Sequence, residues 1–293
     1  MQLEFTDKST LGRFVMRVND HSFKGEGIMN GQKSTINTFV INKGEEQRVT
    51  IDEIVYTMPA RSVLPLVANQ HFIFENPEQL LAWQFNREFY CIMDHDAEVS
   101  CVGFIFYGIR HPMFISLTSE EMHSLATIEQ LFLEDMQLRD SMQGEMLRTL
   151  LKRVIINITR IARKQTVYYQ QVTEDKMDIV RQFNLLLEIN FRKEHEVIFY
   201  AEAMNKSPKT LTNVFRICNC PSPSMLIHNR IILEAKRYLY YTDKSAKEIG
   251  YSLGFESPAH FSRFFKLKTG CNISRFRNRH CEDISNSLRV YAG

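Results

Sequence analysis

No segment of the 293-residue sequence is long and apolar enough to cross a membrane. The longest apolar run, CVGFIFYGI at residues 101–109, falls well short of the roughly 18 residues of a spanning helix and predicts a buried strand instead. The first residues, MQLEFTDKSTLG, lack the apolar block of a secretory signal peptide. We therefore expect a cytoplasmic protein without a membrane partner.

Cysteine is also scarce, and the six that occur do not fit a metal site. None belongs to a CxxC pair, and the group formed by Cys218, Cys220, Cys271 and Cys281 matches no common zinc spacing. We expect reduced, partly buried thiols and predict neither a metal nor another cofactor.

A large excess of one charge is missing too, because the formal net charge is only +2. The charges are nevertheless unevenly placed along the chain. Residues 1–170 contain 17 basic and 21 acidic side chains, a net −4, whereas residues 171–293 contain 19 and 13, a net +6. A basic C-terminal part is typical of a protein whose partner is a polyanion.

The N-terminal part has the pattern of a β-rich domain. Its segments are rich in β-branched and aromatic residues and are separated by Gly, Asn, Asp and Pro, which predicts short antiparallel strands in a sandwich or small barrel. The predicted strands are 38–44, 49–58, 71–77, 81–92, 101–108 and 111–118.

Two helices are predicted after these strands. Thr118, followed three positions later by Glu121, has the pattern of a capping box at the start of a helix. A second helix covers about 142–164 and carries a wide aliphatic stripe. The stripe has two interpretations, packing on the β-domain or a dimer seam, and both can hold. The seam candidates are Leu147, Leu151, Val154, Ile158 and Ile161.

A polar segment, QTVYYQQVTEDK at 165–176, interrupts the helical periodicity. We therefore predict an α+β protein with a β-rich domain over 1–165, a linker over 166–176 and an all-helical domain over 177–293. The helices expected in the last domain are about 177–190, 196–204, 208–218, 223–241, 246–253, 258–268 and 274–279.

One short motif occurs twice in the helical domain. SPKTLTNVF (207–215) and SPAHFSRFF (257–265) share a Ser-Pro start, an apolar fifth residue, a hydroxyl at the sixth and Phe at the ninth. Ser can cap a helix, and Pro suits its first turn. A short predicted helix and a tight turn precede each copy, which is the pattern of a helix-turn-helix.

The second helix of each copy has two different faces. One face is apolar and predicts core packing, and the other carries Lys, Arg, Asn, His and hydroxyl side chains, several of which read base edges in the major groove. A single polar face would indicate only a solvated surface helix, but two capped copies in the basic half favour DNA binding. The helix 223–241 between them is expected to be about 28 Å long, so it can hold two recognition helices about 34 Å, or one DNA turn, apart.

Three stretches resemble the AraC/XylS family of bacterial transcription regulators: IILEAKRYL (231–239), SAKEIGYSLGFESPAHFSRFFKLKTG (245–270) and NISRFR (272–277). The resemblance covers the C-terminal third of the chain. It implies a DNA-binding domain of two helix-turn-helix units joined by a long helix. It also implies an N-terminal β-domain, often cupin-like, that senses a small effector or pairs two chains.

The resemblance also assigns the DNA contacts. The implied base-contacting residues are Lys209, Thr212, Asn213, Ala259, His260 and Arg263, and the implied phosphate-contacting residues are Ser207, Arg216, Ser257 and Lys266. Three residues depart from the family pattern, because Gly250 replaces Ala, Ile273 replaces Pro, and Ala259 can reach at most a thymine methyl group. The second unit is therefore expected to make fewer direct base contacts.

The N-terminal domain resembles the family only in its layout. Trp83, Phe85, Phe104 and Phe106 alternate along strands and could line an effector pocket, although core packing explains them more simply. A metal site is not predicted, because the HxH-plus-carboxylate spacing of a metal-binding cupin is missing. The histidines considered for it are His71, His95 and His111.

These patterns predict a sequence-specific DNA-binding transcription regulator without enzymatic activity. We expect it to form a homodimer and to respond to a small-molecule effector, with RNA polymerase as a further candidate partner. The alternative from another class is a cupin-type, metal-dependent enzyme fused to a helical domain. A third hypothesis keeps the DNA binding but gives the N-terminal domain only a dimerising role.

Overall fold

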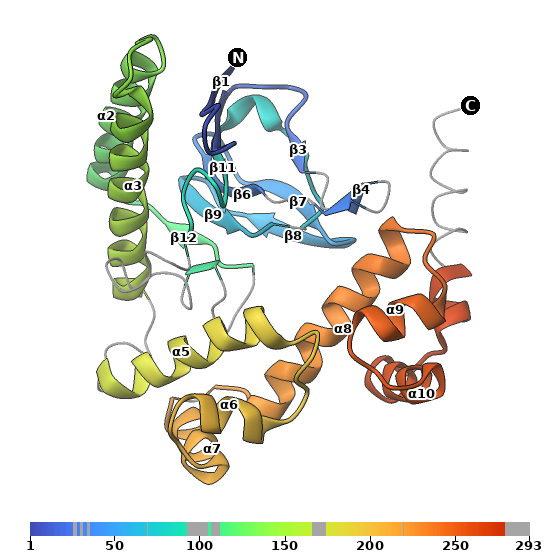
Figure 1. Ribbon diagram of the computed structural model, residues 1–293. Coiled ribbons are helices and arrows are strands. Elements are labelled where there is room, and N and C mark those ends of the chain that lie inside the picture. Colours follow the sequence, from blue (N-terminus) through green and yellow to red (C-terminus); the bar gives the residue numbers. More distant parts are fainter. Residues whose placement is uncertain are drawn as a thin grey trace. The chain divides into compact units, whose positions relative to one another are not determined.

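The computed structural model describes residues 1–25, 28–29, 32–33, 36–68, 70–92, 105–106, 112–165, 174–218 and 220–278. The chain divides into two compact units. Unit 1 comprises Met1–Gly27 and Lys33–Leu185, and unit 2 comprises Ile28–Gln32 and Leu186–Gly293. Antiparallel sheets with two long helices make up unit 1, and helices dominate unit 2 (Figure 1), so the predicted fold class is confirmed.

Unit 1 is built on a six-stranded antiparallel sheet. Its central strands, β6 (Ile36–Asn42) and β11 (Leu80–Asn86), are paired along their whole length. The order of the strands is β1 (Gln2–Thr6), β2 (Arg13–Val18), β11, β6, β9 (Ser62–Leu66) and β12 (Ile115–Ser116). Strands β1, β2 and β9 are not among the sequence-predicted strands.

A four-stranded sheet packs on one face of the first. It contains β3 (Lys24–Gly25), β10 (Phe72–Phe74), β7 (Gln47–Ile51) and β8 (Ile54–Met58), in that order, and β4 (Ile28–Met29) and β5 (Gln32–Lys33) form a separate pair. Asp52 and Glu53 join β7 to β8 with φ of 47° and 66°, as a two-residue hairpin turn requires. The prediction of one strand over 49–58 is therefore wrong, and the segment is a hairpin.

The central strands are buried on both faces, because successive side chains alternate between two cores. Val40 and Ala82 lie in the core shared with the second sheet. Phe39 and Trp83 lie in the other core, which the helices cover, and the Trp83 and Phe132 rings are 5.6 Å apart.

The prediction that aromatic residues of these strands line an effector pocket is not what the structure shows. Trp83, Phe85 and Phe106 are buried in the core beneath the helices, where they pack against other aromatic rings. Phe39, for example, has its ring centroid 4.8 Å from that of Phe106. Core packing is thus the correct interpretation for these three, and Phe104 lies outside the described residues.

Two helices cover the sheet of unit 1, α2 (Ser119–Asp135) and α3 (Gln143–Gln165) (Figure 1). The predicted capping box is confirmed, since the Glu121 amide donates to Thr118 Oγ1 at 3.2 Å and the Thr118 amide donates to Glu121 Oε2 at 2.9 Å. The aliphatic stripe of α3 packs inward against the sheet. The proposed dimer-seam side chains are therefore buried within one chain and form no exposed seam; they are Leu147, Leu151, Val154, Ile158 and Ile161.

The boundary between the units lies inside a helix. Helix α5 (Glu174–Asn190) includes the last three residues of the predicted linker, and the division falls between Leu185 and Leu186. The sequence places the boundary earlier because QTVYYQQVTEDK is polar, yet its last residues form the first turn of α5. Residues 166–173 of the predicted linker lie outside the described part.

Unit 2 is arranged around its longest helix. That helix, α8, contacts α6, α7 and α10, while α9 packs on α10 (Figure 1). The observed helices are α6 (Val197–Ala203), α7 (Pro208–Ile217), α8 (Pro223–Tyr241), α9 (Ala246–Ser252) and α10 (Pro258–Thr269). Each agrees with its prediction to within one residue at either end, and residues 273–278 are also helical.

The described residues contain neither a membrane-spanning helix nor a cluster of metal ligands. No helix among them is both long and apolar enough to cross a bilayer. No three His, Cys, Asp or Glu side chains in these same residues lie close enough to hold a metal ion. Of the three histidines considered from the sequence, only His71 belongs to the described part.

Candidate nucleic-acid interface

Each repeated motif begins with the predicted serine cap. In the first copy the Thr210 amide donates to Ser207 Oγ at 3.0 Å, and in the second the His260 amide donates to Ser257 Oγ at 3.2 Å. A proline follows each serine as the first helical residue. The two helices therefore start in the same way, as the repeated sequence predicts.

The turns before these helices are also equivalent. The Lys206 amide donates to the Ala201 carbonyl at 2.8 Å, and the Phe255 amide donates to the Gly250 carbonyl at 3.0 Å. Each bond spans five residues and encloses one residue of positive φ, which is Asn205 at 52° in the first copy and Gly254 at 80° in the second. Asn and Gly are the residues that best tolerate this backbone conformation. The sequence repeat is thus a repeat of structure: two helix-turn-helix units, α6–α7 and α9–α10.

The apolar side of each second helix is buried. Leu211 and Phe215 of α7 and Phe261 and Phe265 of α10 have no exposed surface. This burial fixes the rotation of both helices, because side chains on the opposite side must then face outward.

The outward face of α7 carries most of the residues predicted to contact DNA. Lys209, Thr212, Asn213 and Arg216 are all exposed. The Arg216 guanidinium donates to Asn213 Oδ1 at 2.8 Å, and the Thr212 hydroxyl donates to the Pro208 carbonyl at 2.9 Å. Since the amide oxygen of Asn213 accepts from Arg216, its NH₂ group is the end that can donate to a base.

These residues surround an open hollow of about 810 Å³ at the start of α7. The predicted DNA contacts leave out three of its members, Val197, Pro208 and Thr210. Thr210 could have been found from the cap, because it lies three residues after Ser207, whereas nothing in the sequence points to Val197 of α6. The lining consists of Val197, Ser207, Pro208, Lys209, Thr210, Thr212, Asn213 and Arg216.

The outward face of α10 carries the predicted DNA contacts of the second copy. Ala259, His260, Arg263 and Lys266 are exposed, while Ser257 is half-buried. The His260 ring lies edge-on to Phe255 at 5.3 Å, which gives the imidazole a supported position. Leu267, which sequence reasoning did not select, is 77% exposed on the same helix.

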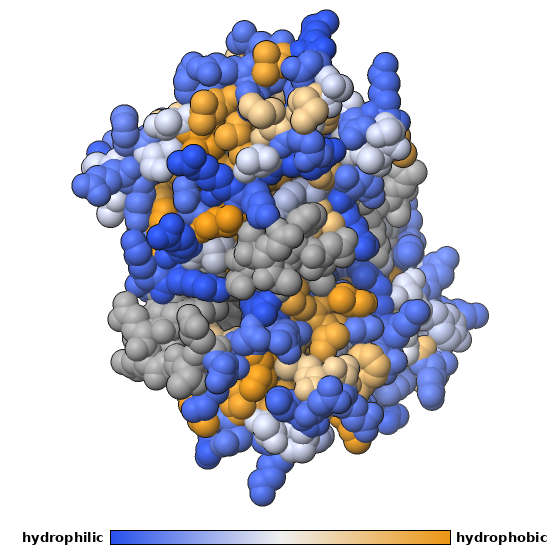
Figure 2. Space-filling model, turned by 60° about the vertical axis from the view of Figure 1, so that its left-hand side comes forward, coloured by the Kyte–Doolittle hydropathy of each residue, from blue (hydrophilic) through white to orange (hydrophobic). Residues whose placement is uncertain are grey.

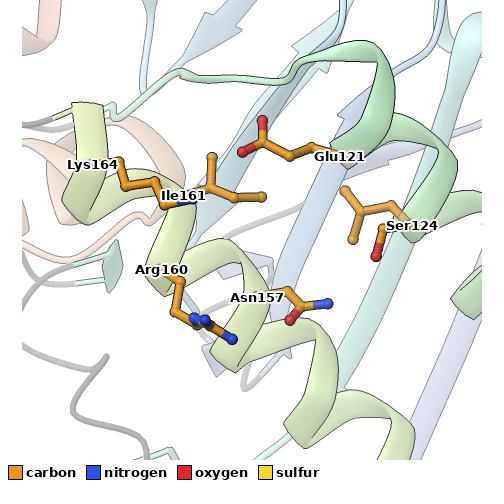
Figure 3. Close-up of a pocket in the computed structure, with 7 residues that line it drawn as sticks. Glu121, Ser124, Asn157, Arg160, Ile161 and Lys164 are labelled. Atoms are coloured by element: carbon orange, nitrogen blue, oxygen red, sulfur yellow. The ribbon is translucent and has the colours of Figure 1, made fainter.

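A second, smaller hollow lies between α2 and α3 of unit 1 and measures about 160 Å³. Figure 3 shows Glu121 and Ser124 on α2 across from Asn157, Arg160 and Lys164 on α3. The other lining residues are Leu125 and Ile161. The lining thus combines two cations, a carboxylate and two neutral polar groups, and it contains none of the residues predicted for an effector pocket.

The thiols of unit 2 are not arranged for reactivity. Among the described residues, no disulfide bond joins the cysteines Cys91, Cys218, Cys220 and Cys271. Burial, with a contribution from nearby Cys218, raises the pKa of the Cys220 thiol to about 12. The thiol therefore stays protonated at neutral pH and is a poor nucleophile or metal ligand.

Residues 200–279 match a protein family described as "Helix-turn-helix domain". The chain is 23% identical over 110 residues to "Histidine kinase P4" from Formosa agariphila, an alignment that covers 38% of this chain but only 8% of that protein. Among solved structures, fatty-acid-bound ToxT from Vibrio cholerae is 14% identical with a TM-score of 0.40, covering 94% of this chain and 92% of ToxT. The AraC-like transcriptional activator CuxR is 11% identical with a TM-score of 0.29, covering 76% of this chain and 73% of CuxR.

The matched residues begin inside α6 and continue past the end of α10, so they include most of the first helix-turn-helix unit and all of the second. All three stretches that carry the AraC/XylS pattern, at 231–239, 245–270 and 272–277, fall inside them. The C-terminal part of the chain, at residues 200–279, is therefore a helix-turn-helix domain of the matched family.

Proposed function

We propose that the protein recognises a specific DNA sequence by inserting α7 and α10 into successive segments of the major groove. The observation that carries this is the duplicated capped helix whose apolar side is buried and whose polar side is exposed. The proposed base contacts are Lys209, Thr212, Asn213, Ala259, His260 and Arg263, and the proposed phosphate contacts are Ser207, Arg216, Ser257 and Lys266.

The side chains suit different bases. The Arg263 guanidinium can donate two hydrogen bonds to guanine, and Asn213 can pair with adenine. The exposed methyl group of Ala259 can pack on a thymine methyl group. The 19 residues of α8 would span about 28 Å, which supports two subsites about one DNA turn, or 34 Å, apart.

Selection of bound sequences from random DNA tests this function. We expect a site with two conserved blocks about 10 base pairs apart, bound on the order of 10³-fold or more tightly than scrambled DNA at physiological salt. Equal affinity for the selected and scrambled duplexes would end the proposal. In cells, the protein would act in the cytoplasm, and RNA polymerase is the partner it would recruit or block.

Unit 1 is proposed to pair two chains through apolar side chains other than the buried stripe. Four large apolar side chains near the α2–α3 connection are exposed: Leu131 (37%), Leu138 (43%), Met142 (60%) and Met146 (47%). Seen from the side of α2 and α3, apolar patches interrupt a mainly hydrophilic surface (Figure 2). Paired chains would remove such side chains from water.

Sedimentation of the full chain tests this pairing. Met142→Glu combined with Met146→Glu is expected to shift a wild-type dimer to monomer. Val55→Glu is the matched control, because Val55 is 61% exposed on β8 of the second sheet, which packs on the face of the first sheet opposite to α2 and α3, and it should leave the dimer intact. A monomeric wild type would exclude the homodimer.

An effector, if unit 1 binds one, is proposed to occupy the α2–α3 hollow. Arg160 and Lys164 would hold an anionic group, and Asn157 and Ser124 would hydrogen-bond to a neutral polar group (Figure 3). Because a ligand that binds the folded state raises its stability, a small carboxylic acid that fits should raise the melting temperature of the wild type but not of Arg160→Ala. The same shift in both proteins would place the ligand elsewhere.

A metal-dependent enzyme is the less favoured function. Its ligand cluster is not found within the described ranges, and the Cys220 thiol is protonated at neutral pH. We propose a regulator without catalysis, and stoichiometric divalent metal in the purified protein would contradict that.

A further inference from the structure

The segment between α5 and α6, residues 191–196, contacts more of unit 2 than a simple connection requires. It leads directly into α6, and so into the first helix-turn-helix unit. It also contacts α8 and the turn of the second unit, as the following interactions show. We call it the coupling segment.

A buried ion-pair network attaches the coupling segment to α8. Glu234 of α8 is fully buried, and its carboxylate accepts from Arg192 Nη2 at 2.5 Å and from Arg230 Nη1 at 3.1 Å. Arg230 also donates to Glu188 Oε1 at 2.7 Å. Both guanidinium groups lie over the Phe191 ring, at 4.3 Å for Arg192 and 3.9 Å for Arg230.

The charged groups of this network stabilise one another in their ionised forms. Burial alone would raise the pKa of Glu234, but the neighbouring cations of Arg230, Arg192 and Arg237 outweigh it and hold that pKa well below its usual range. A buried carboxylate so paired cannot easily lose a partner, because the remaining charge would be left uncompensated. The start of the coupling segment is therefore firmly fixed to α8.

The end of the coupling segment is attached to the second helix-turn-helix unit. His195 Nε2 lies 2.8 Å from the carbonyl oxygen of Leu253, so the imidazole is the donor. The His195 ring also packs on Phe255, with centroids 4.8 Å apart. Gly254 lies between Leu253 and Phe255. A Cβ at Gly254 would lie 2.3 Å from the Arg192 carbonyl oxygen, which shows how closely the backbone of this turn approaches that of the coupling segment.

We infer that His195 is a positioning residue that fixes α10 relative to α7 and thereby sets the spacing of the two DNA subsites. This role rests on the proposed function. Helix α8 joins the two helix-turn-helix units through its own packing against α6, α7 and α10. The His195–Leu253 bond, in contrast, links the entry of the first helix-turn-helix unit directly to the turn of the second. Loss of this bond would let α10 shift. A small shift is enough to change the preferred spacing of the subsites, because one base pair corresponds to only about 3.4 Å along the duplex and a tenth of a turn.

Binding of the full chain to duplexes of altered spacing tests the inference. Subsites from the selected DNA are placed at the native spacing and at one base pair more or less, and a duplex with one subsite is included. The wild type should prefer the native spacing at least tenfold. His195→Ala should reduce that preference by threefold or more without changing single-subsite affinity, and His195→Gln, whose amide nitrogen can replace Nε2 as donor, should restore it.

His228→Ala is the matched control, because the His228 ring contacts Phe264 of α10 from α8, at 5.5 Å, and not from the coupling segment. It should retain the wild-type preference for spacing. The inference is wrong if His195→Ala keeps the wild-type spacing profile, or if it loses single-subsite affinity as strongly as full-site affinity.

A measurement without DNA separates this inference from the proposed function. Amide hydrogen exchange of the full chain should become faster in His195→Ala at residues 253–256 and 191–196, and stay unchanged within α7. Unchanged exchange at 253–256 would overturn the inference even if the protein binds DNA specifically. A wild type that does not distinguish selected from scrambled DNA would instead overturn the proposed function, while the exchange result would still decide whether His195 couples the two units.

Discussion

At the scale of single residues, arginines in unit 2 have opposite environments. Arg230 is half-buried and pairs with Glu188 and Glu234, whereas Arg263 is exposed on α10. The donors of Arg230 have carboxylate partners within the chain, so its role is structural. The exposed one retains donors for an outside partner, which makes it the more informative residue to mutate for DNA binding.

Arg263→Ala is expected to cost about 1–3 kcal/mol of specific binding and to relax the preference at one base pair. Lys266→Ala on the same helix is the control, because a phosphate contact should weaken binding to all sequences alike. Affinities for a panel of single-base variants of the site measure both. A uniform loss for Arg263→Ala would assign Arg263 to the backbone instead of a base.

Two histidines of unit 2 predict a dependence of stability on pH. Burial lowers the pKa of His195 and of His228 below the ordinary value of 6.5. The unfolded chain therefore binds protons more readily than the folded one, so their stabilising contribution is complete above about pH 7 and is lost as the pH falls below 6.5.

Urea unfolding between pH 7.5 and 5.5 measures this effect, since carboxylates titrate mostly below that window. The free energy of unfolding should decrease toward pH 5.5, and the double variant His195→Gln, His228→Gln should show a smaller decrease. A constant value in the wild type would mean that neither imidazole is kept neutral by folding.

At the scale of elements, the ends of helices are the best-determined features of this chain. Glycines at two of these ends have positive φ, Gly254 at 80° and Gly270 at 77°. Their surroundings differ, because a Cβ at Gly254 would lie 2.3 Å from a backbone oxygen, whereas a Cβ at Gly270 would meet nothing within 4 Å.

Alanine at these two glycines separates backbone strain from steric conflict. Gly270→Ala should destabilise unit 2 by about 1 kcal/mol, the cost of a left-handed conformation. Gly254→Ala should cost clearly more, because the Arg192 backbone cannot move without disturbing the coupling segment. Denaturant midpoints compare the two, and equal losses would show that the close approach at Gly254 is relieved easily.

Local signals explain which elements could be predicted from the sequence. Thr118 with Glu121, and Ser207 and Ser257 each followed by Pro, define helix starts within a few residues of chain, and all three caps are confirmed. The exposed face of α7 and α10 follows from the same local pattern. Its assignment to bases and phosphates stays a prediction.

Long-range packing explains what the sequence could not show. Trp83 and Phe85 have the same alternation whether they line a pocket or fill a core, and only the helices above the sheet decide it. The α3 stripe is ambiguous for the same reason, since it could face a sheet or a second chain. The contact of His195 with Leu253 joins residues 58 positions apart, and no spacing rule predicts it.

At the scale of the whole molecule, the uneven charge should govern the response to salt. Residues 171–293 carry a net +6, while residues 1–170 carry a net −4. Binding to DNA through the basic part releases counterions, so the logarithm of the binding constant should fall linearly with the logarithm of salt concentration, by about 0.9 per phosphate contacted.

Affinity for the selected site between 50 and 200 mM salt measures this slope. Arg216→Ala and Lys266→Ala should each lower its magnitude by about one. Arg48→Ala, in unit 1, is the control and should leave the slope unchanged, because its guanidinium pairs with Glu75. A slope near zero in the wild type would exclude binding driven by phosphate neutralisation.

The turns and caps of the two helix-turn-helix units match, so we expect their nine-residue segments to be interchangeable. SPKTLTNVF and SPAHFSRFF supply the same cap, the same proline and a buried Phe at the ninth position. A chimera that exchanges them should fold, and the DNA site selected by it should have its two blocks in reversed order. Such permutation of the operator would show that each segment carries its own sequence preference into a new location.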